Sequence, residues 1–203
     1  MRQAILIARI FSTIFRPSYY PTVGTFILLG FTYLNLFPLL FKIWILTLVY
    51  LFSFCLPTLA TYIYRRLRGW TSAELRKRDN RTVPFIIHIF SYLCLIHILH
   101  ISHIPHFLMA IISISLLIQC VCFAINMWWK VSVHSAGAGG VIGTIIAYAT
   151  IFGFNPIWWL SLAILVAGCV MSSRMLLRQH TLAQVLGGTL IGIVCGIVGT
   201  ILM

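Results

Sequence analysis

Apolar runs long enough to cross a lipid bilayer constrain this sequence more than any other feature. A membrane-spanning helix needs about 20 predominantly apolar residues, and such runs fill most of the 203-residue chain. Hydropathy predicts seven of them, at residues 22–40, 43–64, 84–103, 106–128, 135–153, 156–174 and 180–202. A very short turn near Pro38 and Lys42 joins the first two, so six is the alternative count. The sequence therefore predicts an all-α, polytopic transmembrane bundle of six or seven spans.

Composition argues against a soluble domain. Hydrophobic residues make up 61% of the chain and charged residues only 8%, whereas a soluble domain needs far more charge to cover its surface. No stretch between the apolar runs is long enough for another domain, so we expect one membrane domain over residues 1–203. Residues 1–20 carry Arg2, Arg9 and Arg16 at every seventh position, which favours an amphipathic helix lying in the membrane interface.

Positive charge dominates the few polar segments, with 14 Lys and Arg against Glu74 and Asp79. In so apolar a chain, we expect this charge to meet lipid headgroups or a phosphate group, and not nucleic acid. The basic loop at residues 65–84 combines positive-inside anchoring with candidate anion ligands. The arginine distribution places this loop in the cytoplasm, and we expect an integral protein of the bacterial inner membrane.

Alternating spans bring three polar segments, residues 65–84, 130–134 and 173–180, to one membrane face. Ionisable side chains at membrane depth are costly unless they serve a site. The convergence of three such segments from distant parts of the sequence therefore predicts a functional site at that face.

The segment that contains Ser173-Arg174-x5-His180-x3-Gln184 has the composition of a nucleophilic site. His180 and Gln184 lie one helical turn apart and so share a face. A neutral imidazole is a nucleophile when one ring nitrogen keeps its lone pair and the other is held, and the Gln184 amide oxygen can hold an N–H. The forked guanidinium of Arg174 can take two oxygens of a phosphoryl group.

The segment from Lys130 to His134 adds a second histidine next to Ser132. Small residues follow it, and backbone N–H groups at the start of a helix form a natural anion site. Arg81 adds another guanidinium from the basic loop. A nucleophile, a proton donor and several cations are the groups that phosphoryl transfer requires.

These residues resemble the type 2 phosphatidic acid phosphatase superfamily, which includes the vanadium haloperoxidases. The family pattern is Lys-x6-Arg-Pro, then Pro-Ser-Gly-His, then Ser-Arg-x5-His-x3-Asp. The third motif matches from Ser173 through His180, and the second matches at Ser132 and His134 with valines in place of Pro and Gly. In the first motif Arg81 fills the arginine position, but Glu74 stands where lysine is expected.

The resemblance implies a haloperoxidase-like helical core and a hydrolase that needs no metal or cofactor. It implies that His180 attacks phosphorus to form a phosphohistidine and that His134 protonates the departing oxygen. The implied phosphate ligands are Arg174, Arg81, Ser132 and a lysine, either Lys130 or Lys77. The implied substrates are lipid phosphates of the phosphatidic acid, phosphatidylglycerol phosphate, polyprenyl diphosphate or lipid A class.

Glutamine at position 184 departs from the family's aspartate. It can orient His180 but cannot stabilise an imidazolium by charge, so we expect slower turnover than in a relative with aspartate. The alternatives are a catalytically degenerate relative, phosphoryl transfer to an acceptor other than water, and a non-enzymatic lipid-binding or transporter-type bundle. A separate histidine series at residues 97, 100, 103 and 106 lacks a carboxylate, and we interpret it as an interfacial polar stripe rather than a metal site.

Overall fold

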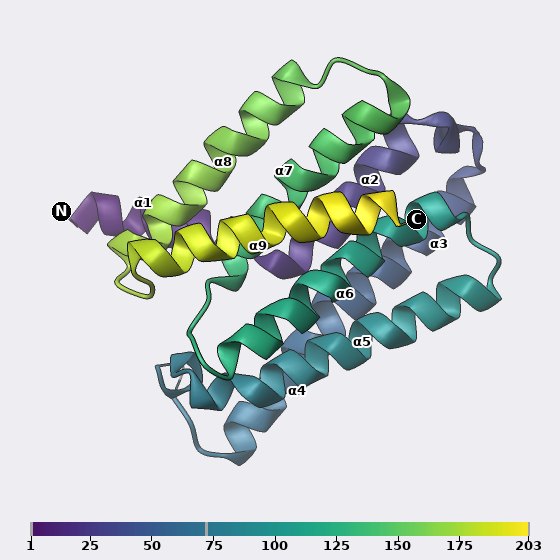
Figure 1. Cartoon of the computed structure of the whole chain (residues 1–203). Coiled ribbons are helices and arrows are strands. Elements are labelled where there is room, and N and C mark those ends of the chain that lie inside the picture. Colours follow the sequence, from purple (N-terminus) through teal and green to yellow (C-terminus); the bar gives the residue numbers. More distant parts are fainter. Residues whose placement is uncertain (1, 72, 203) are drawn as a thin grey trace. The chain divides into compact units, whose positions relative to one another are not determined.

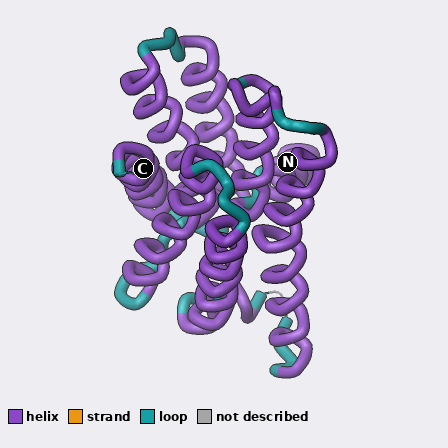
Figure 2. The backbone as a smooth tube through the Cα atoms, turned by 90° about the vertical axis from the view of Figure 1, so that its right-hand side faces the viewer, coloured by secondary structure: helices purple, strands orange, loops and turns teal. Residues whose placement is uncertain are grey.

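The computed structural model describes residues 2–71 and 73–202, apart from the side chains of Arg2, Tyr33 and Arg76. Most of these residues are helical. No strand occurs among these residues, and short loops join the helices (Figure 2). The α-helices labelled in Figure 1 are α1 (Arg2–Ile14), α2 (Tyr20–Phe31), α3 (Leu39–Tyr50), α4 (Leu56–Leu67), α5 (Thr82–Ile101), α6 (His106–Asn126), α7 (Val133–Phe152), α8 (Ile157–Leu176) and α9 (Leu182–Ile201).

Six helical segments in the described part are long and apolar enough to cross a bilayer. They are Leu39–Leu67, Asp79–Ile101, His106–Asn126, Val133–Phe152, Ile157–Leu176 and Leu182–Ile201. The all-α transmembrane bundle predicted from the sequence is thus confirmed, and the chain is an integral membrane protein. The last five predicted spans begin and end within two residues of α5 to α9.

The predicted first span at residues 22–40 does not form one helix. Helix α2 has 12 residues, which gives a length of about 18 Å, well short of the roughly 30 Å hydrocarbon core. Thr32 ends α2 in an extended conformation, a short 3-10 turn occupies Tyr33–Leu36, and Pro38 precedes α3. The six-span alternative is therefore the count that the helix lengths support.

Two compact units make up the described chain, one of residues 18–116 and one of residues 2–17 with 117–202. In the first unit, α3 and α4 are joined by a π-helical turn, Leu51–Cys55, ahead of Pro57. Proline has no N–H, so the Phe52 carbonyl lacks its π-type partner at residue 57. The Ser91 hydroxyl donates to that carbonyl at 2.7 Å, which stabilises the π-helical turn within the long span.

The second unit is built around α7 and α9, which run parallel and touch through backbone. Gly188 of α9 lies against Ser132, the residue before α7, and Gly192 and Gly196 lie against residues 136 and 140 of α7. A Cβ atom at Gly192 would lie 2.0 Å from the Ala136 carbonyl oxygen. Glycine is required there because no other residue lets two helix backbones approach so closely. The parallel arrangement places the N-terminal ends of α7 and α9 together.

Candidate functional site

The N-terminal ends of α7 and α9 are joined by a hydrogen bond between their backbones. Ser132 is the N-cap of α7, and its N–H donates to the Gln184 carbonyl oxygen at 3.3 Å. Thr181 is the N-cap of α9 and forms a capping box with Gln184. Two helix N-termini therefore lie at one place, and each favours a negatively charged group nearby.

His180, which directly precedes the N-cap of α9, is buried. Its Nδ1 lies 3.1 Å from the Gln184 amide oxygen. The same oxygen accepts from the Thr181 backbone N–H at 3.3 Å, so this end of the amide must be the oxygen, which can only accept. Nδ1 of His180 is therefore the donor in this contact, and in a neutral imidazole the lone pair is then on Nε2. That is the tautomer that a nucleophilic imidazole needs.

Lys130 is tied to the turn that precedes His180. Its ammonium donates to the Gln179 carbonyl oxygen at 3.1 Å. In the same turn Arg178 adopts a left-handed conformation with φ of 50°, and the Gln179 N–H donates to the Arg174 carbonyl. The residue 130–134 and 173–180 segments thus meet, and they bring a lysine ammonium to the backbone beside the histidine.

Arg174 lies in the last turn of α8 and is half-buried. Its Nη1 donates to the Ser12 hydroxyl at 2.7 Å, so helix α1 orients this guanidinium. Ser12 is itself buried. This contact joins residues 162 positions apart, and no local sequence pattern pointed to it. Helix α1 therefore contributes a contact to the site region. Its position in the membrane interface stays a prediction.

His134 lies in the first turn of α7, two residues after the N-cap, and is half-buried. The Ser132 hydroxyl is fully buried and lies 3.0 Å from the Ser135 hydroxyl while it accepts the Ser135 N–H. Ser132 thus serves as a helix cap. Its proposed contact with phosphate, like the proton-donor role of His134, stays a prediction.

No protein-family model, curated protein or solved structure matches the chain.

Arg81 and Lys77, the two predicted phosphate ligands in the basic loop, belong to the other compact unit. The Arg81 guanidinium lies 5.5 Å from the Phe85 ring centre, and Lys77 is exposed. Glu74, at the position where the family has lysine, accepts the Thr71 N–H and hydroxyl at 2.6 and 2.9 Å. These bonds lower the pKa of Glu74. The phosphate-binding roles of Arg81 and Lys77 stay predictions.

Among the described residues, no three histidine, cysteine, aspartate or glutamate side chains lie close enough together to hold a metal ion. The four regularly spaced histidines, at 97, 100, 103 and 106, are all exposed. His97 and His100 are on α5, His103 has a φ of 52°, and His106 begins α6. The turn between the helices divides the series, and its role as an interfacial stripe stays a prediction.

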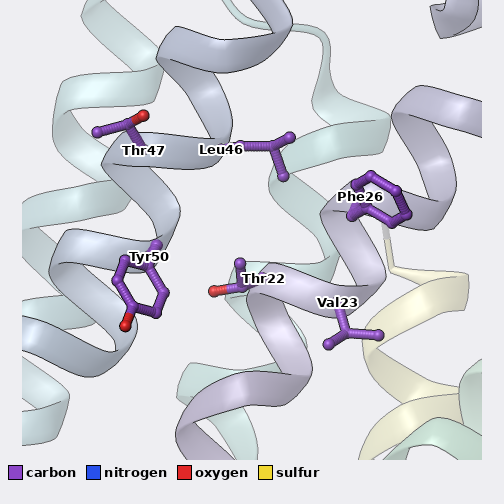
Figure 3. A pocket seen from close by; sticks show the side chains of 6 residues that line it. All are labelled: Thr22, Val23, Phe26, Leu46, Thr47 and Tyr50. Atoms are coloured by element: carbon purple, nitrogen blue, oxygen red, sulfur yellow. The ribbon is translucent and has the colours of Figure 1, made fainter.

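An open groove between α2 and α3 has a volume of about 410 Å³ (Figure 3). Its lining consists of Thr22, Val23, Phe26, Leu46, Thr47 and Tyr50, and Figure 3 shows these side chains coming from both helices. None of the predicted phosphate or catalytic residues lines it, and the side chains that do carry no cation. The groove therefore does not supply the chemistry predicted from the sequence.

Gln184 has two roles, since its side chain orients His180 and also completes the capping box of α9, whereas the sequence predicted only the first. The Thr181-x-x-Gln184 spacing is that of a capping box, and this pattern could have been read before the structure. Ser132-x-x-Ser135 is a related cap signal. Gln179 was not recognised because its contact uses only a backbone carbonyl, which any residue could supply.

Proposed function

We propose that this protein is a membrane phosphatase, similar to type 2 phosphatidic acid phosphatases, that hydrolyses a lipid phosphate or diphosphate through a phosphohistidine. One observation carries the proposal: the Gln184 amide oxygen lies 3.1 Å from Nδ1 of His180 and also accepts the Thr181 N–H, so it is an acceptor that can orient the ring for attack through Nε2. The meeting of two helix N-termini beside Lys130 supports an anion at the same place.

In the first half of the reaction, Nε2 of His180 attacks phosphorus and the bond from phosphorus to the leaving oxygen breaks. His134, in its protonated form, gives its proton to that oxygen, and the lipid alcohol or lipid phosphate departs. The Arg174 and Lys130 cations stabilise the charge on the equatorial oxygens. Ser132 is a further candidate for this role in the same unit, and phosphate binding by Lys77 and Arg81 stays a prediction from the sequence.

In the second half, water attacks the phosphohistidine while His134 takes a proton from it. The bond between phosphorus and Nε2 breaks, inorganic phosphate leaves, and the histidine lone pair is restored. During this cycle the amide oxygen of Gln184 keeps the ring oriented through Nδ1–H. Because an amide has no charge, it stabilises the imidazolium less than a carboxylate would.

The depth of the site in the bilayer is consistent with a lipid substrate. His180 precedes a 20-residue apolar helix, and Arg174 ends another, so both lie at about the depth of lipid headgroups. A phosphorylated headgroup can reach them while its tail stays in the bilayer. The candidates remain phosphatidic acid, phosphatidylglycerol phosphate, polyprenyl diphosphate and lipid A, on the cytoplasmic face of a bacterial inner membrane.

The test is phosphate release by purified protein in nanodiscs, from a panel of these lipids and in the presence of chelator. We expect wild type to release phosphate and His180→Ala to lose the activity by at least about a thousand-fold, as for a removed nucleophile. His97→Ala, which changes an exposed histidine on α5, serves as the matched control and keeps full activity. A labelled enzyme intermediate that is stable in alkali and labile in acid would identify phosphohistidine.

Absence of release from every lipid by folded wild-type protein would refute the proposal. It would favour a lipid-binding or transporter-type bundle, or a degenerate relative. Release that survives in His180→Ala would equally contradict the assigned nucleophile. Recovery of the phosphoryl group on an alcohol in place of water would identify the transferase alternative.

A further inference from the structure

Helix α4 ends in a backbone motif that folds the chain back on the helix. Gly69 has a φ of 66°, a conformation that glycine adopts at little cost. The Gly69 N–H donates to the Arg66 carbonyl at 3.1 Å, and the Trp70 N–H donates to the Arg65 carbonyl at 3.0 Å. This pair of bonds is the Schellman motif, which commonly brings the residue after the glycine against the last helical turns.

The returning chain places Trp70 against Tyr64. Their rings meet edge to face, with centres 5.6 Å apart and planes at 88°. The Arg68 guanidinium carbon lies 5.7 Å from the Tyr64 ring centre and 5.8 Å from that of Trp70. Arg68 is exposed. Two aromatic rings therefore flank the guanidinium of Arg68, and a guanidinium in a cation–π contact can still donate its N–H groups to an anion.

A second exposed guanidinium, that of Arg66, is held in a similar way two residues earlier in the chain. The Arg66 Nε–H donates to the Tyr62 hydroxyl at 3.0 Å, and its guanidinium carbon lies 5.4 Å from the Tyr62 ring centre. The terminal nitrogens of Arg66 are not used in that bond. We call Tyr62, Tyr64, Arg66, Arg68 and Trp70 the arginine–aromatic corner.

The corner lies at the end of the long span Leu39–Leu67. The ends of membrane-spanning helices lie at about the depth of the lipid headgroups. The chain has only two carboxylates to balance its basic loop. Glu74 accepts hydrogen bonds from Thr71, and Asp79 pairs with Arg78 at 3.1 Å. The corner thus presents fixed positive charge, flanked by aromatic rings, to the lipid interface.

We propose that the arginine–aromatic corner binds the phosphate of an anionic phospholipid headgroup, with Arg66 and Arg68 as the ligands. A guanidinium fork matches two phosphate oxygens, and rings that hold the fork in place reduce the entropy lost on binding. Tyrosine and tryptophan at this depth fit the glycerol and upper acyl region of the same lipid. This binding is separate from the proposed catalysis and does not require it.

The experiment measures the affinity of full-length protein in neutral detergent for a fluorescent phosphatidylglycerol, with phosphatidylcholine and inorganic phosphate as competitors. Arg66→Gln and Arg68→Gln should each weaken binding about five-fold, which is the effect of one basic residue near a membrane surface. Lys42→Gln also removes one charge, but from the other end of the span at α3, and it should change the affinity less than two-fold.

Two variants that preserve every charge test the geometry. Arg68→Lys loses the planar fork, and Gly69→Ala strains the left-handed position, where a Cβ would meet nothing within 4 Å. Both should weaken binding two-fold or more. Trp70→Leu removes one ring without straining the backbone and provides the same test if Gly69→Ala does not fold.

The proposal is overturned if the charge-preserving variants bind as wild type does, because binding would then follow charge number alone. It is also overturned if phosphatidylcholine competes as well as unlabelled phosphatidylglycerol. Competition by inorganic phosphate at the same concentration as the lipid would identify an aqueous anion site in place of a lipid site. Repeating the measurement in His180→Ala separates this binding from occupancy of the proposed catalytic site.

Discussion

Replacing Gly192 with alanine should separate α7 from α9. An ideal Cβ at this position lies 2.0 Å from the Ala136 carbonyl oxygen and 2.7 Å from the Gly140 nitrogen. Both atoms belong to helix backbone and cannot rotate away. Since real Cβ atoms essentially never approach closer than 3.0 Å, the helices must separate by about 1 Å at this point.

A gap of that size carries a sizeable cost. A separation of 0.5–1 Å forfeits roughly a quarter to a half of each dispersion contact, and overpacked interiors lose about 1–3 kcal/mol. For a chain of this length, each kcal/mol corresponds to roughly 2–4 °C in melting temperature. We therefore expect Gly192→Ala to lower the melting temperature by about 2–12 °C.

Thermal unfolding followed by tryptophan fluorescence in detergent measures this effect. Gly168→Ala on α8 is the matched control, because a Cβ there meets nothing within 4 Å and alanine favours a helix by up to about 1 kcal/mol. Gly168→Ala should be neutral or stabilising. Equal melting temperatures for the two variants would refute the close backbone contact. Where the protein is active, Gly192→Ala should also reduce phosphate release, since a displacement of about 1 Å can cost up to roughly a hundred-fold in rate.

Two further substitutions test polar contacts. Gln184→Asp should raise phosphate release several-fold because a carboxylate stabilises the imidazolium. Gln184→Leu should lower phosphate release at least ten-fold, as expected for a lost orienting group. A fully active leucine variant would exclude the orienting role. Thr71→Val should raise the pKa of Glu74 part of the way to its ordinary value, because the hydroxyl bond is lost and the backbone bond remains. A lowered pKa means that the carboxylate stabilises its turn above the ordinary pKa and that this stabilisation is lost as pH falls through the folded value. A carbon-13 NMR titration of the Glu74 carboxyl checks the shift, and identical curves for variant and wild type would contradict the assigned cause.

The transmembrane helices were largely predictable because a bilayer imposes one strong requirement, about 20 apolar residues in helical form. Helices α5 to α9 begin and end within two residues of the predicted spans. Residues 22–40 met the same hydropathy criterion but do not form one helix, since the chain extends at Thr32 and Pro38 precedes α3. Average hydropathy does not register such breaks. The division into two compact units had no sequence signal, and the single-domain interpretation stays a prediction.

The candidate site was predictable where its parts are close in sequence. The bond between His180 and Gln184 follows from their four-residue spacing, and the structure contains it. The contacts of Arg174 with Ser12 and of Lys130 with the Gln179 carbonyl depend on tertiary packing. Spacing could not predict them, because a hydroxyl or a backbone carbonyl elsewhere in the chain would satisfy the same cation equally well.

The glycine contacts of α7 and α9 bear on how the two helices align along their length. Both helices repeat small residues every four positions, with Gly188, Gly192 and Gly196 against Ser132, Ala136 and Gly140. A slide of one turn would move Thr200 or Gln184 into the row of close contacts that glycines now fill, so the shape of the interface opposes it. Such a slide would break the bond from the Ser132 N–H to the Gln184 carbonyl. The close glycine contacts and the bond beside His180 thus favour the same register of the two helices.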